Sequence, residues 1–257
     1  MAQIDLQNVH LEFTVGGERH GSLKSALGNA VGKRRRFERV VTALKDLSLS
    51  IKSGERVGLI GHNGAGKSSL LKVTAGIYPP QSGRVITVGH ICPLFEFVTG
   101  FEMEATGWEN IRTRALLLGM SPKEIDAKIE SIGAFTKLGE FLDIPVRHYS
   151  TGMFVRLAFA TSTAVDPQIL LLDEVMAAGD MEFIKSARER MNELMERASI
   201  VLFATHSLDV LPKFCERTIL LSHGEIVADG PTEDVVHLYT AEPERSSREA
   251  DELRTRS

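Results

Sequence analysis

The stretch GHNGAGKS, residues 61–68, fits the pattern G-x-x-x-x-G-K-[ST] of a phosphate-binding loop. The apolar run RVGLI (56–60) before it predicts a strand, and SSLLKVTAG (68–76) after it predicts a helix. In such a loop the glycines let the backbone wrap phosphate groups, the lysine reaches the β and γ oxygens, and the serine hydroxyl ligates Mg²⁺. A chance glycine turn would not be expected between a strand and a helix, so the stretch predicts a nucleotide site.

We therefore assign nucleotide binding to this loop and the residue after it. The candidate residues are Gly61, His62, Asn63, Gly64, Ala65, Gly66, Lys67, Ser68 and Ser69. Among them, Lys67 is expected to reach the phosphates and Ser68 to bind the metal ion.

A phosphate loop needs an acidic partner at the end of a neighbouring strand. The stretch ILLLDEV (169–175) supplies Asp173 and Glu174 directly after four apolar residues. We expect Asp173 to complete the Mg²⁺ site and Glu174 to act as the general base on the attacking water. His206, which follows the apolar run SIVLFAT (199–205), is expected at the same edge of the sheet, where open α/β sheets bind ligands.

Short apolar strands alternate with helical patterns along the chain, which predicts an α/β fold with a mostly parallel core sheet. The runs expected as buried central strands are 56–61, 84–88, 169–173 and 199–205. Alternation over residues 4–13, broken near Asn8, and over 47–51 predicts an antiparallel layer at the N-terminal end. Ser121, Pro122 and Glu124 form a capping box that predicts a helix start.

Composition narrows the class of protein. The chain has 257 residues and a net charge of −4, which argues against a general nucleic-acid binder. Two isolated cysteines, Cys92 and Cys215, suit a reducing cytosol better than a disulfide scaffold. The first residues do not resemble a signal peptide, and no apolar run approaches a membrane helix. These features predict a soluble cytosolic protein.

The sequence predicts a second helix start, and its residues are suited to binding an anion. In YSTGM (149–153), Ser150, Thr151 and Gly152 precede an apolar-periodic run. A helix beginning there would direct free backbone N–H groups and the positive end of its dipole outwards, where phosphate binds well.

The order of the phosphate loop, YSTGM, ILLLDE and THS resembles the ATP-binding subunit of an ABC transporter, over about residues 1–240. This resemblance implies a P-loop NTPase fold, ATP and Mg²⁺ as cofactors, and an inserted helical subdomain over about 96–165. It also implies a head-to-tail homodimer in which the signature residues Ser150, Thr151, Gly152 and Met153 face the γ-phosphate bound by the other subunit. Tyr149, Thr151 and Met153 depart from the family's usual leucine, glycine and glutamine, which indicates a subfamily.

YSTGM followed by RLAFA (156–160) and DEVMAAGDMEF (173–183) is similar to ATPases that export bacterial cell-surface polysaccharides. The resemblance implies that Ala178, Gly179 and Asp180 link the two active sites across the dimer. It implies two copies of a membrane permease as partners, a lipid-linked glycan handled mainly by that permease, and a peripheral position on the cytoplasmic face of the bacterial inner membrane. Nucleic acid is not an expected partner.

For two residues, the sequence allows both a functional and a purely structural interpretation. Phe13 matches the family's aromatic that stacks on adenine, and it fits a core position on a strand equally well. Glu96, in LFEFVTGF (94–101), matches the polysaccharide subgroup's acidic residue in place of the usual sensing glutamine of the coupling loop, and it could also be an ordinary surface acid.

Residues 16–40 form an insertion with an amphipathic patch and a basic run, Lys33–Arg36. The insertion suits a membrane surface, a permease loop, or packing on its own domain. The tail, 241–257, has no periodicity and is predicted to be disordered. We expect no C-terminal carbohydrate-binding domain, because the chain ends at Ser257.

Competing classes lack support in the sequence. A GTPase would need a motif such as N-K-x-D, and a small-molecule kinase would not carry YSTGM before Asp173. A soluble ABC-type ATPase usually has two ATP domains or long coiled-coil arms. Two alternatives remain: an ATPase subunit of another ABC transporter, and a soluble ABC-type ATPase that is not linked to transport.

Overall fold

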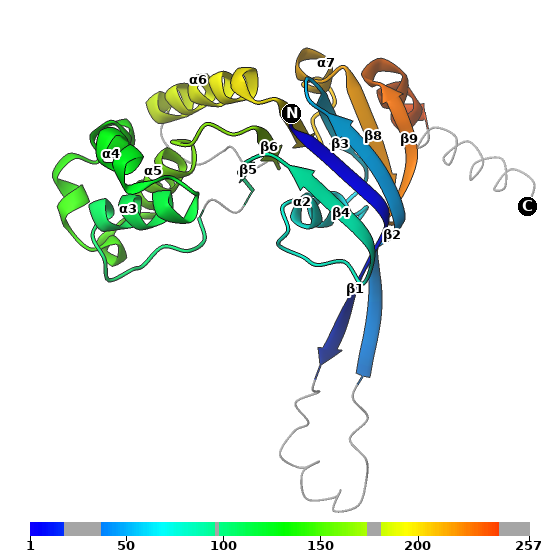
Figure 1. The fold of residues 1–257 in the computed structure, drawn as a ribbon, viewed down its shortest axis with the longest axis horizontal. Coiled ribbons are helices and arrows are strands. Elements are labelled where there is room, and N and C mark those ends of the chain that lie inside the picture. The colour runs from blue at the N-terminus through cyan, green and yellow to red at the C-terminus, as the bar shows by residue number, and fades with distance from the viewer. Residues whose placement is uncertain (18–36, 96–97, 174–180, 242–257) are drawn as a thin grey trace, which may run out of the picture.

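The structure is a computed structural model that describes residues 1–17, 37–95, 98–173 and 181–241. Figure 1 shows a sheet-rich part, a separate group of helices beside it, and a long hairpin that projects from the sheet-rich part.

The central sheet has six strands in the order β5-β6-β7-β3-β8-β9. All neighbouring pairs are parallel except β8 and β9, which are antiparallel. This confirms the predicted α/β fold with a mostly parallel core sheet. The strands are β3 (Arg56–Ile60), β5 (Ile91–Pro93), β6 (Ile169–Leu172), β7 (Ile200–Ala204), β8 (Arg217–Ser222) and β9 (Glu225–Pro231).

A second sheet has three antiparallel strands in the order β2-β1-β4, namely β1 (Gln3–Gly17), β2 (Phe37–Lys52) and β4 (Ser82–Val88). This is the expected antiparallel layer, and the break near Asn8 is confirmed: Asn8 has a φ of 48° and the pairing register shifts there. The assignment of residues 84–88 to a buried central strand was wrong. β4 pairs with β1 and is largely exposed, because a short apolar alternation does not specify which sheet a strand joins.

The insertion expected over residues 16–40 is strand at both ends, since Gly16 pairs with Glu38 and Gly17 with Phe37. β1 and β2 therefore continue as the projecting hairpin of Figure 1. The amphipathic patch and the basic run lie in residues 18–36, outside the described residues.

Three α-helices and two 3₁₀ helices make up the separate helical part (Figure 1). Its elements are α3 (Gly107–Leu117), α4 (Pro122–Thr136), η1 (Gly139–Asp143), η2 (Val146–His148) and α5 (Thr151–Ser162). The capping box at Ser121 is present as predicted, with the Glu124 N–H donating to the Ser121 hydroxyl. Buried residues such as Ile111, Ile132 and Leu157 give this part its own apolar cluster.

The remaining helices flank the sheets: α2 (Lys67–Thr74), α6 (Met181–Arg197), α7 (Leu211–Phe214) and a helical stretch over 232–241. Leu70 and Leu71 of α2 belong to the apolar cluster that joins the two sheets. α6 packs through Phe183, Ala187 and Met191 on residues of β6 and β7. α2, which the phosphate loop enters, thus packs against residues of both sheets.

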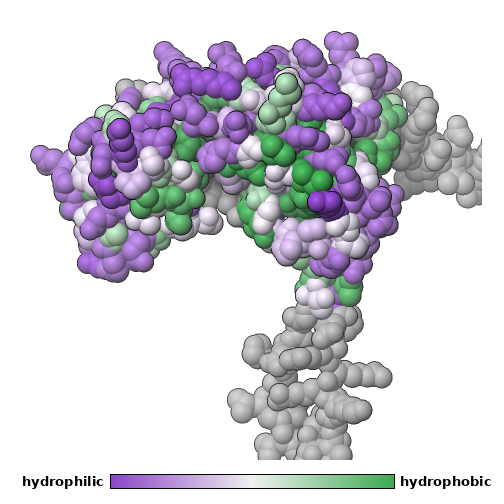
Figure 2. Space-filling model, viewed as in Figure 1, coloured by the Kyte–Doolittle hydropathy of each residue, from purple (hydrophilic) through white to green (hydrophobic). Residues whose placement is uncertain are grey.

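The surface is polar over most of the face in Figure 2, with hydrophobic side chains gathered over the antiparallel sheet and at the root of the hairpin. Val15, Val40, Val41 and Val88 of this sheet are exposed. Within the described residues, we find no helix with the length and apolar character needed to cross a membrane.

Candidate functional site

The phosphate loop, Gly61–Ser68, leaves the end of β3 and enters α2. Gly61 and Gly66 have φ values of 148° and 111°, in the region that side chains disfavour. A Cβ atom on Gly61 would lie 2.2 Å from the Leu221 carbonyl oxygen, and one on Gly66 would lie 2.7 Å from that of Ala43. Glycine is required at both positions because the loop turns sharply against backbone of its own domain.

Lys67 begins α2 and is nearly buried, with 7% of its surface exposed. Its Nζ donates hydrogen bonds to the carbonyl oxygens of Gly61, at 2.7 Å, and His62, at 3.3 Å. The ammonium group therefore lies over the loop itself, where phosphate oxygens would replace carbonyls as its acceptors. Among the other candidates, Asn63 and Gly64 are exposed, Ser69 is half-buried and Ala65 is buried.

The expected metal-binding pair comes together. The Ser68 hydroxyl donates a hydrogen bond to Asp173 Oδ2 at 2.9 Å, and Asp173 follows β6 directly. A hydroxyl and a carboxylate oxygen side by side are ligands that suit Mg²⁺. No cluster of three or more His, Cys, Asp or Glu side chains occurs in the described parts of the chain. The Ser68 hydroxyl and the Asp173 carboxylate fit Mg²⁺, which would take its other ligands from nucleotide phosphates and water.

His206 follows β7, which lies between β6 and β3 in the sheet. The carboxyl ends of these three parallel strands therefore bring the phosphate loop, Asp173 and His206 to the same edge, as expected. The His206 side chain is exposed at this edge.

The sequence did not predict the contacts between the phosphate loop and the turn that joins β8 and β9. The His62 ring lies 4.7 Å from the His223 ring, centroid to centroid, and a hydrogen bond of 3.4 Å joins His62 Nε2 and the Ser222 hydroxyl. The Gly224 N–H donates to the Ala65 carbonyl at 2.9 Å. The turn between β8 and β9 thus supports the phosphate loop. The one sequence signal for this turn is the pair His223-Gly224 directly after a strand.

Ser150 is the N-cap of α5, as predicted. Its hydroxyl oxygen accepts a hydrogen bond from the Met153 N–H at 3.2 Å, and among the described residues the hydroxyl donates no hydrogen bond. Ser150 and Thr151 are exposed, while Gly152 and Met153 are half-buried. The Tyr149 hydroxyl donates to the Phe141 carbonyl at 2.7 Å, and burial raises the pKa of Tyr149 to about 12. This hydrogen bond anchors Tyr149, the residue that precedes the cap.

α5 and the phosphate loop lie apart in the fold. Figure 1 shows α5 in the helical part and α2, which begins at the phosphate loop, under the sheets. Within one chain, the start of α5 and the phosphate loop thus belong to separate parts of the molecule.

Phe13 is half-buried on β1 and packs edge-to-face on Tyr78, with ring centroids 5.3 Å apart. It also contacts the apolar cluster that joins the two sheets. These contacts fit the core interpretation of Phe13, and because the ring is only half-buried, stacking on adenine stays a prediction. Cys92 and Cys215 are both buried free thiols.

Five expected site residues lie outside the described residues: Glu96, Glu174, Ala178, Gly179 and Asp180. Their roles as coupling residue, general base and dimer loop stay predictions.

Known relatives match most of the chain. The O-antigen export system ATP-binding protein RfbE of Yersinia enterocolitica is 41% identical over 231 residues, which cover 88% of this chain and 97% of that protein. The O-antigen export protein RfbB of Myxococcus xanthus is 40% identical over 93% of this chain and 56% of its own length. The teichoic acids export protein TagH of Listeria monocytogenes is 39% identical over 77% of this chain and 58% of its own length. The chain therefore spans nearly all of RfbE and little more than half of the other two.

Solved structures share the fold. The structure titled as an ATP-binding subunit of an ABC transporter has a TM-score of 0.67 at 23% identity and covers 92% of this chain and 93% of that one. A dimeric post-hydrolysis structure of the ATP-binding cassette MJ0796, bound to ADP and Pi, has a TM-score of 0.62 at 23% identity and covers 89% of this chain and 98% of that one. Residues 44–177 match the family model described as ABC transporter. With this match and the relatives above, the chain belongs to the ABC transporter family.

Proposed function

We propose that the chain binds and hydrolyses ATP as the energy-supplying subunit of an exporter for a lipid-linked cell-surface polysaccharide, of O-antigen, capsule, galactan or teichoic-acid type. The hydrogen bond of 2.9 Å between Ser68 and Asp173 carries the ATPase assignment, because it joins the phosphate loop to an acidic strand end. The similarity to RfbE, over 97% of that protein, supports the cargo class. The alternatives are an ATPase subunit of another ABC transporter and a soluble ABC-type ATPase that is not linked to transport.

The chain's own residues divide the chemistry between them. Lys67 and the loop amides bind the β- and γ-phosphates, and Ser68 and Asp173 hold the metal ion. Mg²⁺, when bound, neutralises charge that develops on the phosphate oxygens. Glu174, next in the chain to Asp173, is placed by the sequence to take a proton from the attacking water. His206, at the same sheet edge, is in the correct region to contact the γ-phosphate.

We assign Ser150–Met153 to the nucleotide of a second copy. The exposed N-cap, whose hydroxyl donates no hydrogen bond among the described residues, supports this role, and so does the separation of α5 from the phosphate loop within one chain. Two copies bound head to tail would place each Ser150 against the other copy's phosphate loop.

The proposed assembly is a homodimer on two copies of a membrane permease, at the cytoplasmic face of the bacterial inner membrane. The permease would handle most of the lipid-linked glycan. Similarity to export-system ATP-binding proteins from three bacteria supports this placement.

The function is tested by deleting the gene in its own bacterium and restoring it as wild type or as Lys67→Ala. We expect deletion to remove a surface polysaccharide while its lipid-linked precursor accumulates inside the cell. Wild type should restore export, and Lys67→Ala should not, although both proteins reach the same level. Surface polysaccharide and intracellular precursor are measured in the same cells by extraction and gel analysis.

Unchanged polysaccharide in the deletion strain, together with ATPase activity of the purified chain, would contradict export of this cargo and favour the alternative. Purified chain without ATPase activity would contradict the enzyme assignment itself.

A further inference from the structure

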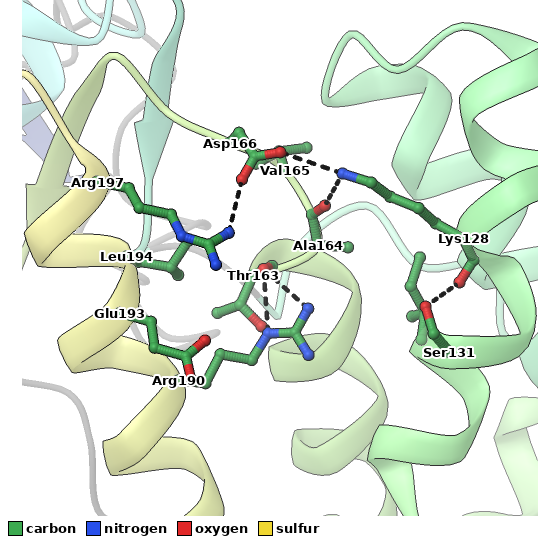
Figure 3. A pocket seen from close by; sticks show the side chains of 11 residues that line it. Lys128, Ser131, Thr163, Ala164, Val165, Asp166, Arg190, Glu193, Leu194 and Arg197 are labelled. Carbon is green, nitrogen blue, oxygen red and sulfur yellow. Dashed lines mark hydrogen bonds and ion pairs between the residues drawn. The ribbon is translucent and has the colours of Figure 1, made fainter.

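A cavity of about 360 Å³ lies where α4, the end of α5 and α6 meet (Figure 3). Three cations from two of these helices surround it: Lys128 of α4, and Arg190 and Arg197 of α6. The close-up shows all three directed towards the chain segment that follows α5. All three cations bind groups of the protein itself, so the residues around the cavity connect these helices to one another.

Arg190 makes half-buried contacts with two of the helices. Its Nε and Nη2 both donate to the Thr163 carbonyl oxygen, each at 3.2 Å. Its guanidinium carbon lies 4.5 Å from the centroid of the Phe135 ring of α4. Burial lowers the pKa of Arg190, a consequence of removing the guanidinium from water. One side chain of α6 thus contacts both α4 and the end of α5.

Thr163 is the C-cap residue of α5. The last carbonyl groups of a helix have no partner within the helix and carry the negative end of its dipole. A guanidinium with two N–H groups on one such carbonyl therefore caps α5 favourably, and its planar shape fixes direction as well as distance.

Asp166 provides a second and weaker connection, on the segment between α5 and β6. It pairs with Lys128 at 3.2 Å and with Arg197 at 3.4 Å. Burial raises the pKa of Asp166, but the hydrogen bonds and positive charges of Lys128 and Arg197 together lower it by more. The pKa of Asp166 therefore lies below its ordinary value. All three side chains are more than 40% exposed, so these ion pairs contribute little to stability on their own.

α6 is also part of the core that carries the nucleotide site. Its residues Phe183, Ala187 and Met191 pack in one apolar cluster with Leu172, the last residue of β6. Asp173, the proposed metal ligand, is the next residue in the chain. α6 therefore lies between the strand that ends at Asp173 and the C-terminal end of the helix that begins at Ser150.

We propose that Arg190 is a positioning residue for ATP-driven dimerisation: by capping α5 from α6, it sets the orientation of Ser150 relative to the strand end at Asp173. This inference rests on the proposed function, because it assumes that Ser150 meets the nucleotide of a second copy. A bidentate cap at the far end of a rigid helix of 12 residues controls the direction in which the other end points.

The test uses the full chain with Glu174→Gln, which slows hydrolysis and lets an ATP-bound dimer accumulate. Arg190→Lys keeps the charge but loses the planar pair of N–H groups, and Arg190→Gln loses both. Arg188→Gln is the matched control, since Arg188 is exposed on the same helix. Two quantities are measured: the affinity of the monomer for a fluorescent ATP analogue, and the ATP concentration at half-maximal dimerisation in size-exclusion chromatography.

We expect Arg190→Gln to raise the ATP concentration for dimerisation roughly tenfold, with Arg190→Lys between it and the parent. Monomer affinity should stay within about twofold of the parent in both, and Arg188→Gln should behave as the parent. If Arg190→Gln does not fold, Arg190→Lys makes the same comparison.

Dimerisation at parent ATP concentrations in the Arg190 variants would overturn the inference. An equal loss of monomer affinity and dimerisation would also overturn it, because Arg190 would then only support the fold. A Glu174→Gln parent that binds ATP without dimerising would contradict the proposed function instead, which separates the two failures.

Discussion

The Ser68 hydroxyl and the Asp173 carboxylate, 105 residues apart in the chain, lie 2.9 Å apart across the ends of β3 and β6. Ser68 lies in the first turn of α2 and Asp173 directly follows β6, and each provides an oxygen that a hard cation prefers. A double-mutant cycle measures whether they act together. We expect Ser68→Ala and Asp173→Asn each to weaken Mg²⁺-ATP binding by roughly tenfold, and the double variant to lose less than the sum of the two free-energy changes.

The control for this pair is nucleotide binding in EDTA. Because both side chains act through the metal, their variants should bind metal-free ATP about as well as wild type. Strictly additive losses, or equal losses with and without Mg²⁺, would remove these two residues from a shared metal site.

Glu174→Gln should preserve Mg²⁺-ATP affinity and reduce turnover by roughly a hundredfold to a thousandfold. The physical reason is that glutamine keeps the size and hydrogen-bonding oxygen of glutamate but cannot accept the proton from water. Affinity is measured by nucleotide titration and turnover by phosphate release. Near-normal turnover would show that another group acts as the base.

Gly61→Ala should damage the phosphate loop far more than Gly54→Ala. Both glycines have positive φ values, but only a Cβ at Gly61 would clash, at 2.2 Å from a backbone oxygen, whereas a Cβ at Gly54 meets nothing within 4 Å. We expect Gly54→Ala to lower the free energy of unfolding by about 1 kcal/mol. Gly61→Ala should lower it by about 3 kcal/mol or displace the loop and abolish ATP binding. Denaturant unfolding and nucleotide titration check both, and equal effects of the two substitutions would contradict the described loop.

Both cysteines should resist alkylation in the folded protein at pH 8. Burial raises the pKa of Cys92 and of Cys215 to about 12, so at pH 8 nearly all of each thiol is protonated, and the thiolate is the reactive form. Reactivity should increase only as pH approaches 12 or as the protein unfolds. Mass spectrometry after iodoacetamide treatment reports the modified fraction; rapid labelling of folded protein at pH 8 would contradict the burial of these side chains.

The sequence predicted those parts of the site that depend on short local patterns. The glycines and lysine of residues 61–68, the acid after a buried strand and the serine at a helix start each follow from neighbours in the chain. The residues that sequence reasoning missed act across long separations: His223 supports the loop at His62, and Arg190 caps α5 at Thr163. β4 was misplaced for the same reason, because its partner β1 lies more than 70 residues earlier and nothing in residues 84–88 specifies that pairing.

The central claim is that Ser150 serves the nucleotide of a second copy, and adding Ser150→Arg to the Glu174→Gln chain tests it most directly. The bulky side chain would stand at the exposed start of α5, where a phosphate must approach within hydrogen-bond distance. The chain's own phosphate loop is unchanged, so monomer affinity for ATP should remain at the parent value, whereas Lys67→Ala in the same background should lose it. Size-exclusion chromatography with and without ATP should then show a dimer for the parent and only monomer for Ser150→Arg. A Ser150→Arg chain that still dimerises on ATP, or that loses ATP affinity as a monomer, would contradict the account.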